Sequence, residues 1–208
     1  MKKLLCLVLI LALILPLAAC GEKPTALNLA AKAVEEGKAP DFEALRQENP
    51  EILAWLHIPA ASVNAPVSLS GPGLTIETYE SDPNPDAPVI VLHGEPAGES
   101  APFRGLQKSF SVPDSLGSGI TLYTPGGTQT FTVFGAGAYK DMEILKIYDN
   151  FRNRKNIPWF VDQWQKYHTM IRILDDDMEI TKDDRLLVLS TGLNQTPGQQ
   201  FLVLAKAV

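Results

Sequence analysis

Cysteine is nearly absent from this chain of 208 residues. Only two occur, Cys6 and Cys20, and both lie at the N-terminal end. Residues 21–208 therefore cannot form a disulfide, bind a metal through thiolates or supply a cysteine nucleophile. Their stability must come from a hydrophobic core, and a hydrophobic content of 45% is sufficient for one.

The sequence also lacks a long apolar run. A membrane-spanning helix needs about 20 consecutive apolar residues. Its main apolar run covers residues 4–17, follows Lys2 and Lys3, and leads into Leu-Ala-Ala-Cys at 17–20. This pattern is typical of a lipoprotein signal peptide, with an ordinary secretory signal as the alternative. We predict cleavage before Cys20, lipid on its sulfur, and a position on the extracellular face of the cytoplasmic membrane. Two or three acyl chains, at about 0.8 kcal/mol per buried methylene, would hold the protein there.

Positive charge is scarce as well. Lysine and arginine number 18 against 24 aspartates and glutamates, which gives a net charge of −6. Removal of Lys2 and Lys3 with the signal peptide would make it −8. An acidic surface of this kind argues against nucleic acid or anionic lipid surfaces as partners.

The remaining sequence has the pattern of a β-rich domain. Apolar alternation and turn residues predict strands at 52–58, 65–69, 88–92, 119–123, 129–138, 185–191 and 200–207. Gly126-Gly127 fits a hairpin turn between two of them. We predict three parts: a signal peptide at 1–19, a lipidated tether with one short helix at 20–40, and a domain at 41–208.

Three helices are predicted from apolar residues at helical spacing. The first covers about 27–34 and ends near Gly37, and the second starts at Asp41, a good N-cap residue. The third and strongest covers about 156–172, with an apolar stripe that includes His168. We interpret His168 on this helix, and His57 on the first strand, as packing residues.

Five short motifs follow one another between residues 41 and 208. They read NPEILAWLHIP at 49–59, VIVLHG at 89–94, FRGL at 103–106, GITLYT at 119–124, and LVLSTG at 187–192 with QFLV at 200–203. In this order they resemble the motifs of class B sortases. The resemblance implies an α+β fold that is mainly β with flanking helices, a sortase-like β-barrel. Family members carry a helix and a strand before the histidine motif, so we expect this barrel to be trimmed between residues 68 and 88.

The same resemblance places the catalytic positions of the family on His93, Gly192 and Gln200. A sortase cuts a sorting signal with a cysteine thiolate and passes the acyl group to an amine, but here glycine stands in the cysteine position and glutamine in the arginine position. Loss of a nucleophile can cost on the order of 10⁶ in rate. Loss of a charged oxyanion donor costs roughly 10²–10³. We therefore predict a sortase-like pseudoenzyme in which His93, Ser190, Thr191, Gly192 and Gln200 form a groove for a sorting-signal-like peptide or a surface protein.

Two alternatives stay open. An active, cysteine-independent hydrolase or transpeptidase would pair His93 with a serine or threonine. Ser190 shares the strand face of Gly192, about 6–7 Å away, whereas Thr191 points to the opposite face. The second alternative is a structural envelope lipoprotein whose groove is vestigial. His93 itself is either a residue of the groove or a leftover polar residue at a strand end with no role.

The acidic residues between 175 and 184 do not form a recognised cation site. They lack the glycine and the terminal glutamate of a calcium loop, so a solvated acidic loop is the better interpretation. The sequence contains no zinc ligand set, phosphate-binding glycine loop or nucleophile-elbow motif. We expect neither a metal site nor a cofactor.

Overall fold

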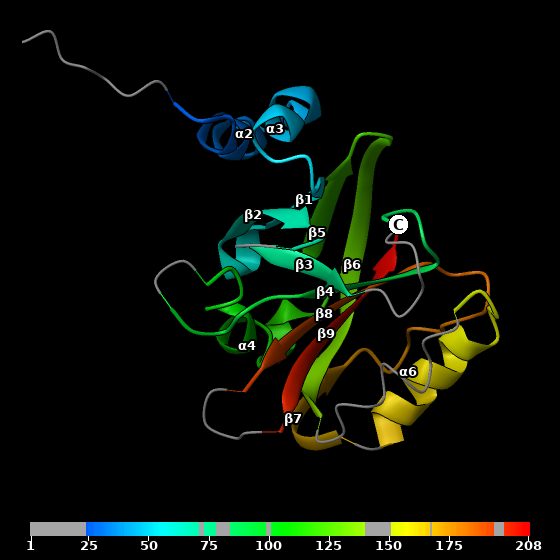
Figure 1. Cartoon of the computed structure of the whole chain (residues 1–208). Helices are drawn as coiled ribbons and strands as arrows, with labels where there is room; N and C mark the ends of the chain where they lie inside the picture. The colour runs from blue at the N-terminus through cyan, green and yellow to red at the C-terminus, as the bar shows by residue number, and fades with distance from the viewer. Residues whose placement is uncertain are drawn as a thin grey trace, which may run out of the picture.

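Nine strands form one mixed sheet in the computed structural model, which describes residues 24–70, 73–77, 84–98, 101–139, 151–166, 168–193 and 198–208 (Figure 1). The strands are β1 (Ile52–Ile58), β2 (Val63–Ser68), β3 (Leu74–Glu77), β4 (Val89–His93), β5 (Gly119–Thr124), β6 (Gly127–Tyr139), β7 (His168–Leu174), β8 (Leu186–Gly192) and β9 (Gln200–Ala207). Their order is β5-β1-β2-β3-β4-β8-β9-β6-β7. Because β5 also pairs with β6, eight strands close into a barrel and β7 extends it along β6. The predicted mainly-β barrel with flanking helices is confirmed.

Two strand pairs are parallel, β2 with β3 and β4 with β8, and the other pairs are antiparallel. The predicted hairpin is present: β5 and β6 pair from Thr124↔Gly127, which leaves Pro125 and Gly126 as the loop. Thr124 Oγ1 accepts a hydrogen bond from the Gly126 amide and donates one to the Gly127 carbonyl. The side chain of Thr124 thus fixes the turn that starts the longest strand.

The helices are α2 (Ala26–Glu35), α3 (Phe42–Glu48), α4 (Leu106–Ser109) and α6 (Asn156–Lys166), with 3₁₀ turns η1 (Pro59–Ala61) and η2 (Pro113–Ser115). Asp41 caps α3 as predicted, since its Oδ1 accepts from the amides of Glu43 and Ala44 at 3.0 Å. Gly37 follows α2 with a φ of +76°, a conformation that suits glycine after a helix. No helix in the described residues is long and apolar enough to cross a membrane.

Helix α2 packs on the outside of the barrel. Its Ala30 and Val34 are buried in a cluster with Trp55 of β1. The Trp55 indole donates to Asn64 Oδ1 at 2.6 Å, and Asn64 Nδ2 donates to the carbonyl of Ala31 at 2.9 Å. The helical part of the predicted tether is therefore joined to β1 and β2. The predicted signal peptide and Cys20 lie outside the described residues.

Two larger apolar clusters lie on the two sides of the sheet. The barrel interior contains inward residues such as Leu56, Leu92, Leu189 and Val203. The second cluster lies on the outer side, beneath α6, and its members are Val89, Val91, Phe134, Tyr139, Phe151, Ile157, Phe160, Val161, Trp164, Leu186, Val188, Leu202 and Leu204. Figure 1 shows α6 along this side of the barrel. Successive side chains of β4, β8 and β9 therefore point in turn into the barrel interior and into the outer cluster beneath α6.

The stretch expected to be trimmed and turn-rich contains strand β3. It pairs parallel with β2 at Val67↔Leu74 and antiparallel with β4 at Ile76↔Leu92. Leu74 and Ile76 are buried in the barrel interior, alternating with polar residues. The expectation that residues 68–88 lack a strand is wrong, because four residues suffice to bridge β2 and β4.

The C-terminal limit of the third helix is also a correction. Helix α6 ends at Lys166, and β7 begins at His168. The predicted extension to residue 172 is wrong, and His168 belongs to a strand, where its backbone pairs with Tyr139. Strand pairing with β6 overrides the helical spacing that continues past residue 166.

Candidate functional site

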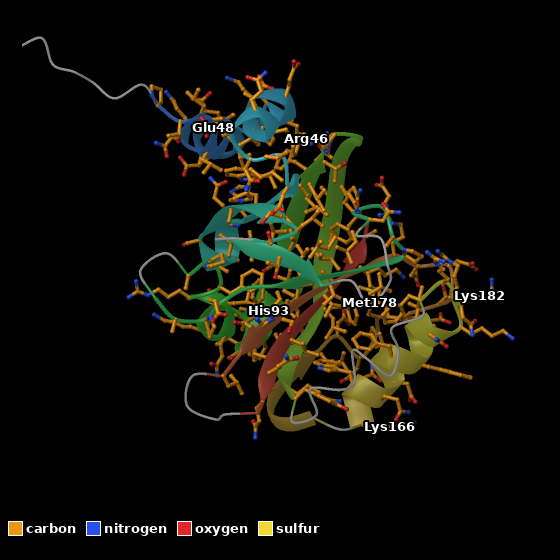
Figure 2. All side chains as sticks on the ribbon, in the orientation of Figure 1. Arg46, Glu48, His93, Lys166, Met178 and Lys182 are labelled. Atoms are coloured by element: carbon orange, nitrogen blue, oxygen red, sulfur yellow. The ribbon has the colours of Figure 1, made fainter. Side chains whose placement is uncertain are left out.

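The outer face of β4, β8 and β9 becomes polar at one end. On β8, Leu187 and Leu189 face the barrel interior and Val188 faces outward, so Ser190 and Gly192 lie on the outer side. The backbone register pairs His93 with Ser190 and Gly192 with Gln200. Figure 2 shows His93 where β4 ends beside β8. Four of the five predicted groove residues therefore share one face.

A serine links the other two polar side chains of this face. Ser190 Oγ donates a hydrogen bond to Gln200 Oε1 at 3.3 Å, and His93 Nδ1 lies 3.5 Å from Ser190 Oγ. Ser190 is 0% exposed and Gln200 is 9% exposed, whereas His93 is half-buried. With its proton directed at Gln200, the serine oxygen can accept a proton shared by His93 Nδ1. We call His93, Ser190 and Gln200 the polar row.

Thr191 lies apart from the polar row. It is buried on the interior side of β8, and its Oγ1 donates to the carbonyl of Gly94 at 2.7 Å. The Gly94 amide in turn donates to the carbonyl of Ser190 at 3.1 Å. Thr191 thus holds the end of β4 against β8, and its predicted position in a groove with Gly192 is wrong because the strand alternates.

Gly94 is required by packing, but Gly192 is not. A Cβ on Gly94 would lie 2.6 Å from Phe103 Cδ2 and 2.7 Å from Leu74 Cδ2, closer than side chains can approach. A Cβ on Gly192 would meet nothing nearer than Pro96 Cγ at 4.0 Å, which is ordinary contact. The backbone at Gly192 therefore has room for a side chain beside the polar row.

Tyr139 is a neighbour of the polar row that the sequence interpretation did not include. It is the last residue of β6, and its backbone pairs with Gln200 of β9. The side chain is buried in the outer cluster. Tyr139 follows the predicted strand 129–138 directly, so one more residue of alternation would have identified it. It marks the border between the apolar cluster and the polar row.

Two described side chains, those of His57 and Asp184, have shifted pKa values. Burial lowers the pKa of His57, while the nearby Glu35 carboxylate acts in the opposite direction. The pKa of Asp184 is also lowered: burial would raise it, but hydrogen bonds from Thr181 and Lys206 outweigh that effect. No group of three or more histidine, cysteine, aspartate or glutamate side chains among the described residues could hold a metal ion.

Comparison with known proteins finds similarity in structure. No family model matches the sequence, and no curated protein matches it. A mutant form of Clostridium perfringens sortase B matches with a TM-score of 0.67 and 18% identity, over 88% of this chain and 95% of that chain. The Staphylococcus aureus sortase B–substrate complex matches at 0.61 and 18%, over 89% and 92%. Sortase B from B. anthracis, in complex with AAEK2, matches at 0.64 and 19%, over 81% and 83%. At these identities the likeness establishes the fold alone.

Proposed function

Because the chain has the class B sortase fold, we propose that it is a membrane-anchored, sortase-like protein without transpeptidase activity that binds an extended peptide at the polar row. The observation that carries this proposal is the pairing of Gly192 with Gln200 beside His93. These are the positions at which the sequence resemblance expects a cysteine and an arginine. On this proposal the site keeps the strand arrangement of the family, but of the three catalytic side chains it keeps only the histidine.

The hydroxyls nearby are poorly placed to replace the missing thiol. Ser190 is fully buried, and its hydroxyl is held by Gln200 Oε1 at 3.3 Å, a shorter contact than the 3.5 Å to His93 Nδ1. Thr191 is buried on the opposite face and donates to a backbone carbonyl. A nucleophile needs an accessible oxygen and a base that takes its proton. These contacts argue against the alternative of a serine- or threonine-dependent hydrolase.

The same site retains groups suited to binding. Gln200 Oε1 accepts from Ser190, and its Nε2 amide has no hydrogen-bond partner among the described residues. An amide donor held by a buried serine can bind a peptide carbonyl at low entropic cost. The room beside Gly192 would admit a peptide side chain or backbone. Recognition of this kind needs no nucleophile.

The proposed lipid anchor would keep the barrel close to the membrane. Helix α2 begins at Ala26, six positions after Cys20. A fully extended segment of that length spans about 20 Å. Since α2 is bonded to Asn64 of the barrel, the site would remain near the outer surface of the cytoplasmic membrane. Mass spectrometry of the mature protein tests this anchor: Cys20→Ser should abolish both the lipid mass and recovery in the membrane fraction.

The first test is a titration of the full-length protein, in a maltoside detergent, with a panel of sorting-signal peptides. Binding heat and peptide cleavage are measured together. We expect saturable binding without cleavage, and at least 5-fold weaker binding in Gln200→Ala, since a single neutral hydrogen bond contributes about 1 kcal/mol. Gln47→Ala, which changes an exposed glutamine on α3, is the matched control.

Two results would contradict the proposal. Cleavage that disappears in His93→Ala would establish an active enzyme. Absence of both binding and cleavage would favour the structural envelope lipoprotein.

A second test restores the two missing groups. The variant Gly192→Cys with Gln200→Arg should gain thiol-dependent peptide cleavage if the groove is retained and only the chemistry is lost. Gly192→Ala with Gln200→Arg is the control, since it fills the same space without a thiol. A restored variant whose thiol reacts with a small alkylating reagent but cleaves no peptide would argue that the groove itself no longer accepts sorting signals.

A further inference from the structure

An open hollow lies between η1 and α4, away from the polar row. Its volume is about 610 Å³, and its lining includes Ser62, Arg104, Gly105, Lys108, Ser109 and Val112. None of its lining residues belongs to the polar row. Figure 1 shows α4 on a different side of the barrel from α6. The hollow is therefore a second candidate site, and it does not depend on the function proposed above.

Two cations face this hollow, and neither pairs with a carboxylate among the described residues. Arg104 lies two residues before α4 and Lys108 lies within it, and both side chains are exposed. Neither side chain has a hydrogen bond or an ion pair with a described residue. By contrast, Lys38, Lys166 and Lys182 each pair with a nearby aspartate or glutamate. In a chain with a net charge of −6, two cations without a described carboxylate partner beside one hollow favour an anionic ligand.

Ser62 contributes a hydroxyl to the hollow from a strained backbone. Its φ of 54° is the only positive value at a non-glycine residue in the described chain. Glycine would adopt this conformation more readily. This conformation ends the 3₁₀ turn η1, since the Ser62 amide donates to the Pro59 carbonyl at 3.1 Å, and it places Ser62 among the lining residues of the hollow. Ser109, on the opposite side of the lining, offers a second hydroxyl without a described partner.

Gly105 allows the two walls of the hollow to meet. A Cβ at this position would lie 3.1 Å from the Ala61 carbonyl oxygen of η1, tighter than ordinary contact. Glycine lets the start of α4 approach η1 closely, so that residues of both elements line the hollow. The shape of the hollow therefore depends on this close backbone contact as well as on the lining side chains.

We propose that this hollow binds a phosphate ester. A guanidinium can hold two phosphate oxygens at once, a lysine adds a point charge, and hydroxyls donate further hydrogen bonds. The volume lies within the range of about 300–1,000 Å³ typical of small-molecule sites, which exceeds the space that a bare ion needs. Val112, 50% exposed, offers apolar contact to the carbon part of the ester. The ester could come from a soluble glycerol phosphate or from a phospholipid headgroup.

The test uses the full-length protein in a maltoside detergent. Glycerol 3-phosphate is titrated in one arm, and phosphatidylglycerol or phosphatidylcholine is added to the micelles in the other. We expect saturable chemical-shift changes at α4 and η1, and at least 10-fold weaker binding in Arg104→Gln/Lys108→Gln. The control Lys38→Gln/Lys182→Gln removes the same charge from exposed sites elsewhere and should bind as the wild type does.

Ser62→Gly separates binding from folding. It should raise the thermal midpoint by relieving the backbone and still weaken binding several-fold by removing the hydroxyl. Saturation by glycerol 3-phosphate identifies a soluble ester as the source, and a response to phosphatidylglycerol alone identifies the headgroup. No saturable binding in either arm would overturn the proposal. Equal weakening in the control pair would also overturn it, because binding would then depend only on overall charge.

Discussion

The two ends of one sheet surface differ in what their outward side chains do. On β8, outward Leu186 and Val188 join the apolar cluster beneath α6, while outward Ser190 belongs to the polar row a few residues later. The strand geometry is the same at both ends, and only the residue type changes. The apolar end should carry much of the stability of this face, and the polar end should carry binding. Variants at matched positions can separate these two contributions.

The largest effect is expected at the apolar end, in Trp164→Ala. Trp164 belongs to α6, is 0% exposed, and its ring packs against Gly135 of β6. Removal of a buried indole should lower the free energy of unfolding by about 3–5 kcal/mol, measured by urea denaturation. Trp159→Ala, on the same helix but 59% exposed, should change it by less than about 0.5 kcal/mol. Equal losses in the two variants would contradict the burial that distinguishes them.

Two glycines on this outer surface give a sharper comparison. A Cβ on Gly135 of β6 would lie 3.1 Å from the Trp164 ring and 3.3 Å from Leu174 Cδ1, whereas a Cβ on Gly192 has room. Gly135→Ala should therefore destabilise by about 1–3 kcal/mol, because the buried indole cannot move aside freely. Gly192→Ala should stay within about 0.5 kcal/mol of the wild type. Thermal denaturation of both variants checks the pair, and the reverse order of stabilities would refute the packing argument.

Within the polar row, Ser190→Ala should have a smaller effect. It removes the donor to Gln200 Oε1 and leaves that oxygen in a nearly buried position. The expected loss is about 1 kcal/mol, the usual net value of a neutral hydrogen bond. A double-mutant cycle with Gln200→Ala isolates the interaction between the two side chains. A coupling of zero would mean that the hydrogen bond does not stabilise the fold.

The smallest effect on stability is expected for His57, a half-buried residue on the outer side of β1. Burial lowers its pKa below the ordinary value, so the unfolded chain binds a proton more readily than the folded one. Its contribution to stability should be complete above the unfolded pKa of about 6.5 and should decline as the pH falls through that value toward the lowered folded pKa. His57→Gln should flatten this decline in denaturation series between about pH 8 and pH 5. An unchanged slope would show that His57 is not the responsible group.

The sequence predicted most strands because their apolar residues alternate or form short buried runs. It missed β3, where only Leu74 and Ile76 carry the pattern. It also merged β7 into the preceding helix, because Ile171 happens to continue the spacing of the apolar stripe on α6. Pairing with distant strands decides such segments, and local spacing cannot reveal it.

The candidate site was predicted in part. Alternation along β8 placed Ser190 and Gly192 on one face, and the family resemblance placed Gly192 and Gln200 at catalytic positions, which the structure pairs across β8 and β9. The hydrogen bond from Ser190 to Gln200 and the neighbouring position of Tyr139 depend on the register of three strands. Sequence patterns do not fix that register residue by residue. The lipid on Cys20 stays a prediction.

The parallel pairing of β4 with β8 has a consequence for how the protein reaches its native state. His93 and Ser190 are separated by 97 positions, so their contact requires closure of a very long loop. Contacts of such high sequence separation slow folding. If the chain emerges from its N-terminus first, β4 has no β8 to pair with until nearly the whole chain has emerged, and its Val-Ile-Val-Leu edge stays open to other strands until then. The contact between His93 and Ser190 would then form late in folding, because it needs β8 in place.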